Sequence, residues 1–204
     1  EGLYEKICEN GRFKLDDVRK HPHGHIFDVE ETVQAKDPGC EERLDVGNRH
    51  MMAELEQVLA FDFTAEQADR DYPYRLISRR SNNFLNSAGR TLPGSKLSRG
   101  KLYNPLFMHP EDLTELGLEP GQTVTIASRH DRIPSIVEAD ETMRRKVVST
   151  YHCFGGLVDD DDRFVEQGSN VGRLTPSDVE YDPISGIPRM SNIAVSISPG
   201  WKQA

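Results

Sequence analysis

The sequence predicts a mainly β protein with short helices, in which a small β barrel with a helical crossover follows an extended, partly helical leader. Three observations predict this fold. Short stretches typical of strands recur from residue 74 onward, and residues 123–127 alternate as a half-buried strand does. One clear short helix lies between two of these stretches. Residues 1–45, in contrast, are rich in Gly, Pro and acids, which is typical of an arm or a linker.

The leader shows little regular structure. Residues 11–18 allow at most one short helix, whereas residues 53–60 place apolar side chains at helical spacing, which predicts a surface helix. His21, His23 and His25 alternate in a Pro/Gly loop without an acid or Cys at useful spacing, so we interpret them as part of a flexible linker and not as a metal site. The chain begins without Met, so we expect part of a larger protein or a processed product.

The barrel half divides into strands, one helix and turns. The predicted strands are residues 74–78, 123–127, 133–139, 147–151 and 193–197. The predicted helix covers residues 109–118, because Pro110 and two acids stand in its first turn and Gly117 provides a stop. We interpret the acidic run 159–162 and the basic run 144–146 as solvated turns.

Composition excludes several classes of protein. The chain has 204 residues and a net charge of -9, with no apolar run long enough to span a bilayer. No signal peptide is visible. Residues 1–70 hold 9 basic and 17 acidic residues, so nucleic-acid binding is not expected. Three widely spaced cysteines without a CxxC pair argue against a disulfide framework, a zinc knuckle or an iron–sulfur cluster, and the cytoplasm is the default compartment.

A basic segment reverses the sign of the charge locally. Between Tyr74 and Tyr103 the chain carries seven Arg and Lys residues and no acid. Residues 78–87 add Asn and Ser directly after the first predicted strand. Arg supplies forked, charge-assisted donors and Asn and Ser supply directed neutral hydrogen bonds, a combination that suits phosphate. The segment therefore predicts a site for an anionic ligand.

Three further segments have the chemistry of ligand contacts. Residues 104–112 lead a polar loop into a helix N-terminus, where free N–H groups favour anions. Residues 152–156 end a strand in a glycine turn, which allows close approach of the backbone to a ligand. Residues 168–175 combine small residues with an amide and a cation.

Together with a fifth segment, these four resemble the C-terminal domain of the molybdopterin oxidoreductases, the family of formate dehydrogenases, nitrate reductases and dimethyl sulfoxide reductases. The resemblance runs from about Arg43 to Pro199 and is nearest to the formate-dehydrogenase-like or assimilatory-type branch. Each segment alone is weak, but all five follow the order of the family. The matching segments are Arg79–Asn86, Leu106–Asp112, Val147–Ser149 with His152 and Gly155, Asn170–Val171 with Leu174–Thr175, and Asp182–Pro188.

The resemblance implies a double-psi β barrel, like that of aspartate decarboxylase, which folds over a molybdopterin guanine dinucleotide. It implies an arm from upstream catalytic domains at residues 1–42, the barrel domain at 43–199 and a tail at 200–204. The domain would hold the pterin and guanosine diphosphate parts of the cofactor. Its partners would be that small molecule and the upstream domains of the same polypeptide, with no nucleic acid and no membrane segment.

The resemblance also implies particular contacts. The first loop would meet the cofactor, the second would meet a nucleotide or support the loop, and the last two would line the pterin. In that order the residues are Arg79, Asn83, Asn86 and Ser87; Asn104 and Asp112; His152, Phe154 and Gly155; and Asn170 and Val171. No catalytic residue and no metal ligand is expected in this chain.

One departure from the family qualifies these expectations. The family usually has a second Asn where this chain has Gly172, so one pterin contact is missing or is supplied by Arg173. The ligand of the molybdenum or tungsten, and any iron–sulfur cluster, would belong to an upstream domain. We therefore expect the fragment alone to be inactive. The full-length protein would be cytoplasmic, with the periplasm as the alternative.

Two other functions stay open. A β-barrel interaction module without cofactor could use the acidic leader as a docking arm. A pyruvoyl-type decarboxylase shares the barrel and cleaves itself at a Gly-Ser bond, which occurs here at Gly94-Ser95 and Gly168-Ser169. That enzyme is shorter and lacks the five matching segments.

Overall fold

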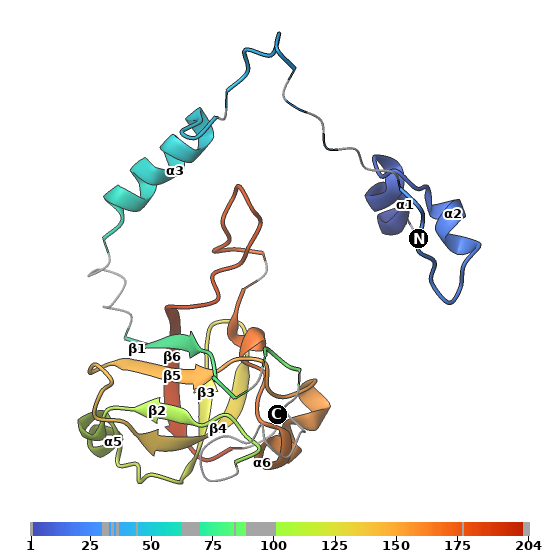
Figure 1. The fold of residues 1–204 in the computed structure, drawn as a ribbon. Coiled ribbons are helices and arrows are strands. Elements are labelled where there is room, and N and C mark those ends of the chain that lie inside the picture. The colour runs from blue at the N-terminus through green and yellow to red at the C-terminus, as the bar shows by residue number, and fades with distance from the viewer. Residues whose placement is uncertain are drawn as a thin grey trace. The chain divides into compact units, whose positions relative to one another are not determined.

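The computed structural model describes residues 2–29, 33, 35, 37–43, 45–62, 70–83, 85–88, 101–176 and 178–201. By its internal contacts the chain divides into two compact units, Glu1–Val46 and Gly47–Ala204 (Figure 1). The boundary that we predicted, between residues 42 and 43, stays a prediction.

The first unit consists of two short helices and an aromatic cluster. Helices α1 (Gly2–Glu9) and α2 (Leu15–Arg19) bury no residue. The rings of Phe13 and Phe27 stack at 4.1 Å, and those of His21 and His25 at 4.0 Å. Only one short helix was predicted here, and α1 was missed because its apolar residues stay exposed and give no sign of a packed face.

The second unit begins with α3 (Arg49–Ala60), which is longer than the predicted helix. The Asn48 side chain caps it by accepting hydrogen bonds from the backbone N–H groups of His50 and Met51, at 3.1 and 3.0 Å. This cap moves the start of the helix four residues before the first position that apolar spacing indicated.

Six strands close into a barrel in the order β1-β5-β2-β4-β3-β6 (Figure 1). They are β1 (Tyr74–Arg79), β2 (Leu106–Met108), β3 (Thr123–Ala127), β4 (Arg132–Ala139), β5 (Val147–Tyr151) and β6 (Ile193–Pro199). The pairs β1–β5 and β2–β4 are parallel and the other neighbours are antiparallel. The prediction of a mainly β, barrel-forming fold with few short helices is confirmed.

Alternating side chains fill the barrel. Val124 and Ile126 of β3, like Leu76 of β1 and Val148 of β5, are fully buried. In β3 and β6 the buried residues fall at every second position, because successive side chains on a strand point to opposite faces. The same alternation sends the intervening side chains outward, so the core determines which side chains face a ligand.

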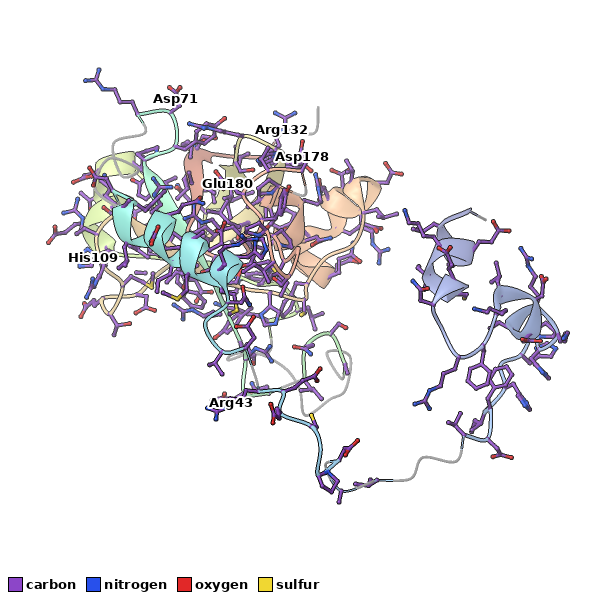
Figure 2. All side chains as sticks on the ribbon, turned by 90° about the horizontal axis from the view of Figure 1, so that it is seen from above. Arg43, Asp71, His109, Arg132, Asp178 and Glu180 are labelled. Atoms are coloured by element: carbon purple, nitrogen blue, oxygen red, sulfur yellow. The ribbon has the colours of Figure 1, made fainter. Side chains whose placement is uncertain are left out.

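Strand β2 was not predicted, because its three residues stand within a segment interpreted as a polar loop. Its pairing with β4, where Leu106 lies opposite Val137, supplies the order that so short a sequence cannot show. Helix α5 (Pro110–Leu116) follows it, with His109 (labelled in Figure 2) as the cap and Gly117 in the left-handed conformation as the stop, as predicted.

The basic run is exposed and ends in a turn, as predicted, whereas the acidic run is helical and partly buried. The acidic run forms the 3-10 helix η3 (Val158–Arg163), in which Asp161 is buried. It continues into α6 (Phe164–Gln167) and is followed by η4 (Val171–Leu174). In the basic run, Arg145 and Lys146 both bind acids of α5. Sequence alone could not place the partners of these charges, which come from distant segments.

Within the described residues no helix is long and apolar enough to cross a membrane. Those residues also contain no group of three or more His, Cys, Asp or Glu side chains placed to hold a metal ion. Cys8, Cys40 and Cys153 are all free thiols.

Candidate functional site

Two of the predicted loops leave the barrel side by side. Strands β1 and β5 run parallel, with Arg79 opposite Tyr151 as the last pair, so the loops that follow begin at the same end of the barrel (Figure 1). His152 joins them: its backbone N–H donates to the Arg79 carbonyl at 3.3 Å, and its Nδ1 lies 2.9 Å from the same oxygen. The topology therefore brings the first and third predicted loops together.

Asn104 ties the third loop to the fourth. Its side chain is buried and its amide Nδ2 donates to the carbonyls of Tyr151 and Ser169, at 2.8 and 3.0 Å. Its Oδ1 accepts from the Ser169 N–H at 2.7 Å. All polar atoms of the side chain are thus engaged by backbone. Asn104 supports the two loops, which is the second of the two roles expected for it.

Two glycines permit close packing of these loops. A Cβ on Gly155 would lie 2.4 Å from the Asn170 nitrogen, and one on Gly168 would lie 2.5 Å from Asn104 Oδ1. Both residues have a positive φ, of 73° and 79°. Larger side chains are therefore excluded both by contact and by backbone conformation. Phe154 is buried beside Gly168, so its ring packs the loop from within.

The fourth loop ends in η4, which Asn170 caps. Asn170 Oδ1 accepts from the Gly172 N–H at 3.0 Å, and Nδ2 donates to the Gly156 carbonyl at 3.3 Å. Asn170 remains partly exposed, whereas the side chain of Val171 belongs to the hydrophobic core. A contact from Val171 to a ligand would therefore have to come from its backbone.

The first loop presents exposed polar groups. Leu85 and Ala88 form an isolated bridge around Asn86 and Ser87, and the Ala88 N–H donates to the Leu85 carbonyl at 2.9 Å. Asn86 has φ 51°, a conformation that Asn tolerates better than most residues. Asn83, Asn86 and Ser87 are all exposed. Arg90, Lys96 and Arg99 of the basic segment lie outside the described residues.

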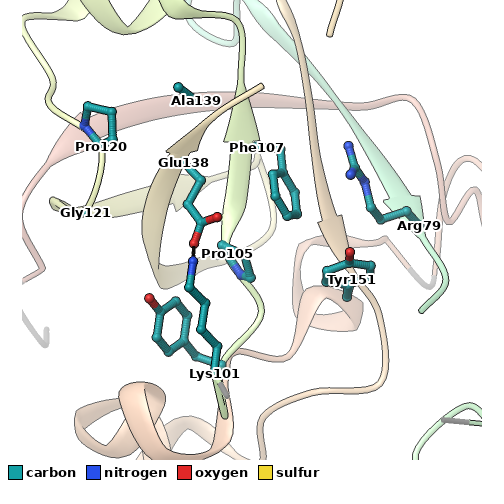
Figure 3. A pocket seen from close by; sticks show the side chains of 10 residues that line it. Arg79, Lys101, Pro105, Phe107, Pro120, Gly121, Glu138, Ala139 and Tyr151 are labelled. Carbon is teal, nitrogen blue, oxygen red and sulfur yellow. Dashed lines mark ion pairs between the residues drawn. The ribbon is translucent and has the colours of Figure 1, made fainter. Parts of the chain in front are cut away.

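Arg79 lies in a cleft of about 580 Å³ on the outer wall of the barrel (Figure 3). Its guanidinium lies 4.2 Å from the centre of the Phe107 ring, and Tyr151 meets Phe107 edge to face at 5.7 Å. On the other side of the cleft Lys101 pairs with Glu138. The lining residues are Arg79, Lys101, Tyr103, Pro105, Phe107, Pro120, Gly121, Glu138, Ala139 and Tyr151.

The electrostatics of Arg79 leave it able to bind an anion. Its Nη2 lies 3.4 Å from Asp140 Oδ2, a long contact, and no other hydrogen bond of its side chain to oxygen is made within the described residues. The pKa of Asp140 is lowered, first because the Thr142 hydroxyl donates to it and in smaller part because Arg79 is near. Asp140 is thus partly satisfied by Thr142, and Arg79 keeps donors for a ligand.

Asp112 lies at the other end of the barrel. It is fully buried, and its two oxygens accept from Arg145 Nε and from the Lys146 N–H, both at 2.7 Å. Lys146 precedes β5, whereas the candidate loops follow it. The five residues of β5 span on the order of 17 Å. Asp112 therefore supports the loop before β5, the second of its expected roles, and is remote from the other candidates.

Arg173 is not available to replace the contact expected at Gly172. Its Nε donates to Asp131 at 2.7 Å, its Nη1 to both oxygens of Asp161 at 2.7 and 2.8 Å, and its Nη2 to the Arg132 carbonyl at 3.0 Å. Its side chain is 13% exposed. The expectation that Arg173 would reach a ligand is not met by this arrangement.

Sequence reasoning missed the aromatic and ionic lining of the cleft. Phe107 was quoted only as part of a family segment, and neither Tyr151 nor Glu138 was singled out. The burial patterns of β4 and β5 are not regular enough to mark Glu138 and Tyr151 as lining residues. The lining could be found only after β2 was recognised, since Phe107 and Glu138 lie opposite each other in its pairing with β4.

Comparisons with known proteins identify relatives of this chain. The family model described as "Molydopterin dinucleotide binding domain" matches residues 74–194. The chain is 29% identical over 132 residues to the F420-dependent formate dehydrogenase 2 subunit alpha of Methanococcus maripaludis, covering 65% of this chain and 18% of that protein.

A solved structure shows the same fold. The acetylene hydratase of Pelobacter acetylenicus superposes with a TM-score of 0.56 at 15% identity, covering 69% of this chain and 20% of that one. The chain thus spans about a fifth of the length of either relative. The family match extends over more than half of the residues and includes strands β1 to β5 and the first two residues of β6. The chain belongs to the molybdopterin dinucleotide-binding domain family.

Proposed function

We propose that this chain is the part of a molybdenum or tungsten oxidoreductase that holds the pterin and guanosine diphosphate parts of a molybdopterin guanine dinucleotide. The observation that carries the proposal is the shared position of three predicted loops at one end of the barrel, where Asn104 and His152 join them. Family membership supports the class of cofactor. The fragment would bind cofactor without turning over substrate.

The chemistry of the loops fits such a ligand. The exposed amides and hydroxyl of Asn83, Asn86 and Ser87 offer neutral hydrogen bonds, and Arg79 offers a charged donor with the geometry that phosphate prefers. Gly155 packs against the backbone of Ser169 and Asn170, and Asn170 keeps a partly exposed amide side chain. A pterin edge, which alternates donors and acceptors, needs groups of this kind.

The residues divide into contacts and supports. We assign contacts to Arg79, Asn83, Asn86, Ser87, His152 and Asn170, with Gly155 and Val171 acting through backbone. We assign support to Asn104, Asp112 and Phe154, because each is buried with its side chain packed or fully engaged. The cofactor supplies the metal and the redox chemistry when bound, and its metal ligand and any iron–sulfur cluster would belong to upstream parts of the polypeptide. The cytoplasm stays the predicted compartment.

The test is cofactor content in the whole protein. Arg79→Ala and Asn86→Ala each remove a hydrogen bond to a charged or strongly polar group, worth about 1.5–3 kcal/mol when the partner is charged. We expect bound metal and releasable guanosine nucleotide to fall in both variants while circular dichroism shows a folded barrel. Arg144→Ala is the matched control for the loss of charge, because Arg144 is an exposed Arg. Unchanged metal in both variants contradicts the assignment of the first loop.

The interaction module without cofactor is the second candidate. It predicts no affinity for guanine nucleotides, whereas the cleft beside Arg79 predicts salt-sensitive binding of GDP. Calorimetry at low and high salt separates the two.

A self-cleaving enzyme has less support: Ser169 is buried and its hydroxyl donates to the Pro134 carbonyl, while Gly94-Ser95 lies outside the described residues. Intact mass of the purified chain tests it.

A further inference from the structure

Arg173 lies only three residues after Asn170, but its side chain forms a network of hydrogen bonds with two acids and does not join the candidate loops. We name the set Arg173, Asp131 and Asp161 the Arg173 clamp. Its acids come from separate segments: Asp131 lies in the turn between β3 and β4, and Asp161 lies on η3. The clamp therefore joins η4 to two elements that are distant in sequence.

The geometry of the clamp is directional. The fork of Arg173 Nη1 to both oxygens of Asp161 and the bond from Nε to Asp131 fix the guanidinium plane. Its Nη2 also donates to the carbonyl of Arg132, the residue labelled in Figure 2. Lys in place of Arg173 could keep the charge but could not make these bonds together.

One acid of the clamp is buried and the other is partly exposed: the side chain of Asp131 is 35% exposed. Asp161 is 5% exposed. Burial acts to raise the pKa of Asp131, but the hydrogen bonds from Arg173 and from the Arg132 N–H outweigh it, so the pKa is lowered. The lowered pKa means that the hydrogen bonds of the clamp favour the charged form of this carboxylate.

Helix η4 connects the Arg173 clamp to Asn170 of the candidate site. Val171 and Leu174 fasten one side of this short helix to the core, and the clamp fastens it through Arg173. Asn170 caps the same helix through the Gly172 N–H, and its carbonyl accepts from the Arg173 N–H at 3.2 Å. The orientation of Asn170 is thus set by a helix that has two anchors.

We propose that Arg173 is a positioning residue, which holds Asn170 in the orientation for cofactor binding through Asp131 and Asp161. The proposal rests on the proposed function, in which Asn170 contacts the dinucleotide. The proposal also gives a role to the Arg that follows Gly172: its side chain stabilises the loop and does not contact the ligand.

The first experiment needs no cofactor. In the 204-residue chain, hydrogen exchange of the Gly172 N–H reports whether Asn170 keeps its cap. Arg173→Lys is expected to accelerate that exchange roughly tenfold, as local opening becomes easier. Arg163→Ala, which breaks only an exposed pair with Glu166, is expected to leave it unchanged. Unchanged exchange in Arg173→Lys overturns the proposal.

The second experiment measures how fast the whole protein loses its metal during dialysis. Arg173→Lys is expected to raise that rate roughly tenfold, the size of one lost hydrogen bond. A triple variant, Arg173→Met with Asp161→Leu and Asp131→Asn, replaces the ion pairs by apolar side chains at 173 and 161 and by a neutral amide at the partly exposed position 131, and it is expected to retain stability. Fast metal loss in the triple variant supports a positioning role, whereas a return to the wild-type rate shows a merely structural one and overturns the proposal.

Asn170→Ala separates this inference from the proposed function. If Asn170→Ala accelerates metal loss and Arg173→Lys does not, the positioning role fails while the cofactor contact stands. If neither variant changes the rate, the positioning role fails together with the contact assigned to Asn170.

Discussion

Replacing Asn104 by Ala tests how strongly this side chain stabilises the loop after β5 and the loop around Ser169. The substitution removes three hydrogen bonds, which join the side chain to the Tyr151 carbonyl and to both backbone groups of Ser169. At about 1 kcal/mol for each bond, with a further penalty for polar groups left buried and unpaired, we expect a loss of roughly 3–5 kcal/mol in the free energy of unfolding. Domains of this size are stable by about 5–15 kcal/mol, so the loss is large but compatible with folding.

The assay is urea unfolding of the 204-residue chain, followed by circular dichroism and by the fluorescence of its single Trp. Asn82→Ala is the matched control, since Asn82 is exposed in the first loop and is expected to change stability by less than about 0.5 kcal/mol. A loss below about 1 kcal/mol in Asn104→Ala would refute the reasoning, because it would place these bonds within the range of ordinary surface changes.

Three further predictions follow from packing and charge. Gly155→Ala is expected to lower the urea midpoint more than Gly186→Ala, because both have a positive φ but only Gly155 has backbone within 3.0 Å of the added Cβ; equal shifts would show that strain alone matters. The lowered pKa of Asp131 means that its stabilisation is present above its unfolded pKa of about 3.9 and is lost as pH falls through the lower folded value. The stability difference between wild type and Asp131→Asn should therefore shrink below pH 4 in acid titrations, and a constant difference argues against the ion pair. Asp112→Asn should lower stability by weakening the pair with Arg145, while metal bound per folded whole protein stays unchanged; a loss of metal would return Asp112 to the binding site.

The barrel could be predicted because most of its strands and its helix are marked by sequence patterns within each segment. Short stretches rich in β-branched residues mark β3, β4, β5 and β6, and Pro110 with Gly117 marks the limits of α5. Strand β2 escaped because three residues are too few to show a period. Helix α1 escaped because an exposed helix lacks a buried face.

The chemistry of the site divides in the same way. The polar loops could be found from their composition and from the family resemblance, and the parallel pairing of β1 with β5 then explains why they meet. The partners of buried charges could not be found, since Arg173 reaches Asp131 and Asp161 across long intervals of sequence. For the same reason Asp112 was grouped with ligand contacts, although it binds Arg145 at the far end of the barrel.

The structure of the whole protein with its cofactor, by cryo-electron microscopy or crystallography, tests the central claim most directly. The account predicts dinucleotide density against the loops at residues 83–87, 152–156 and 168–171, with a phosphate or pterin group within hydrogen-bond distance of Arg79, Asn86 and Asn170. Density for the dinucleotide that touches none of these loops, or that lies at the α5 end of the barrel beside Asp112, would contradict it.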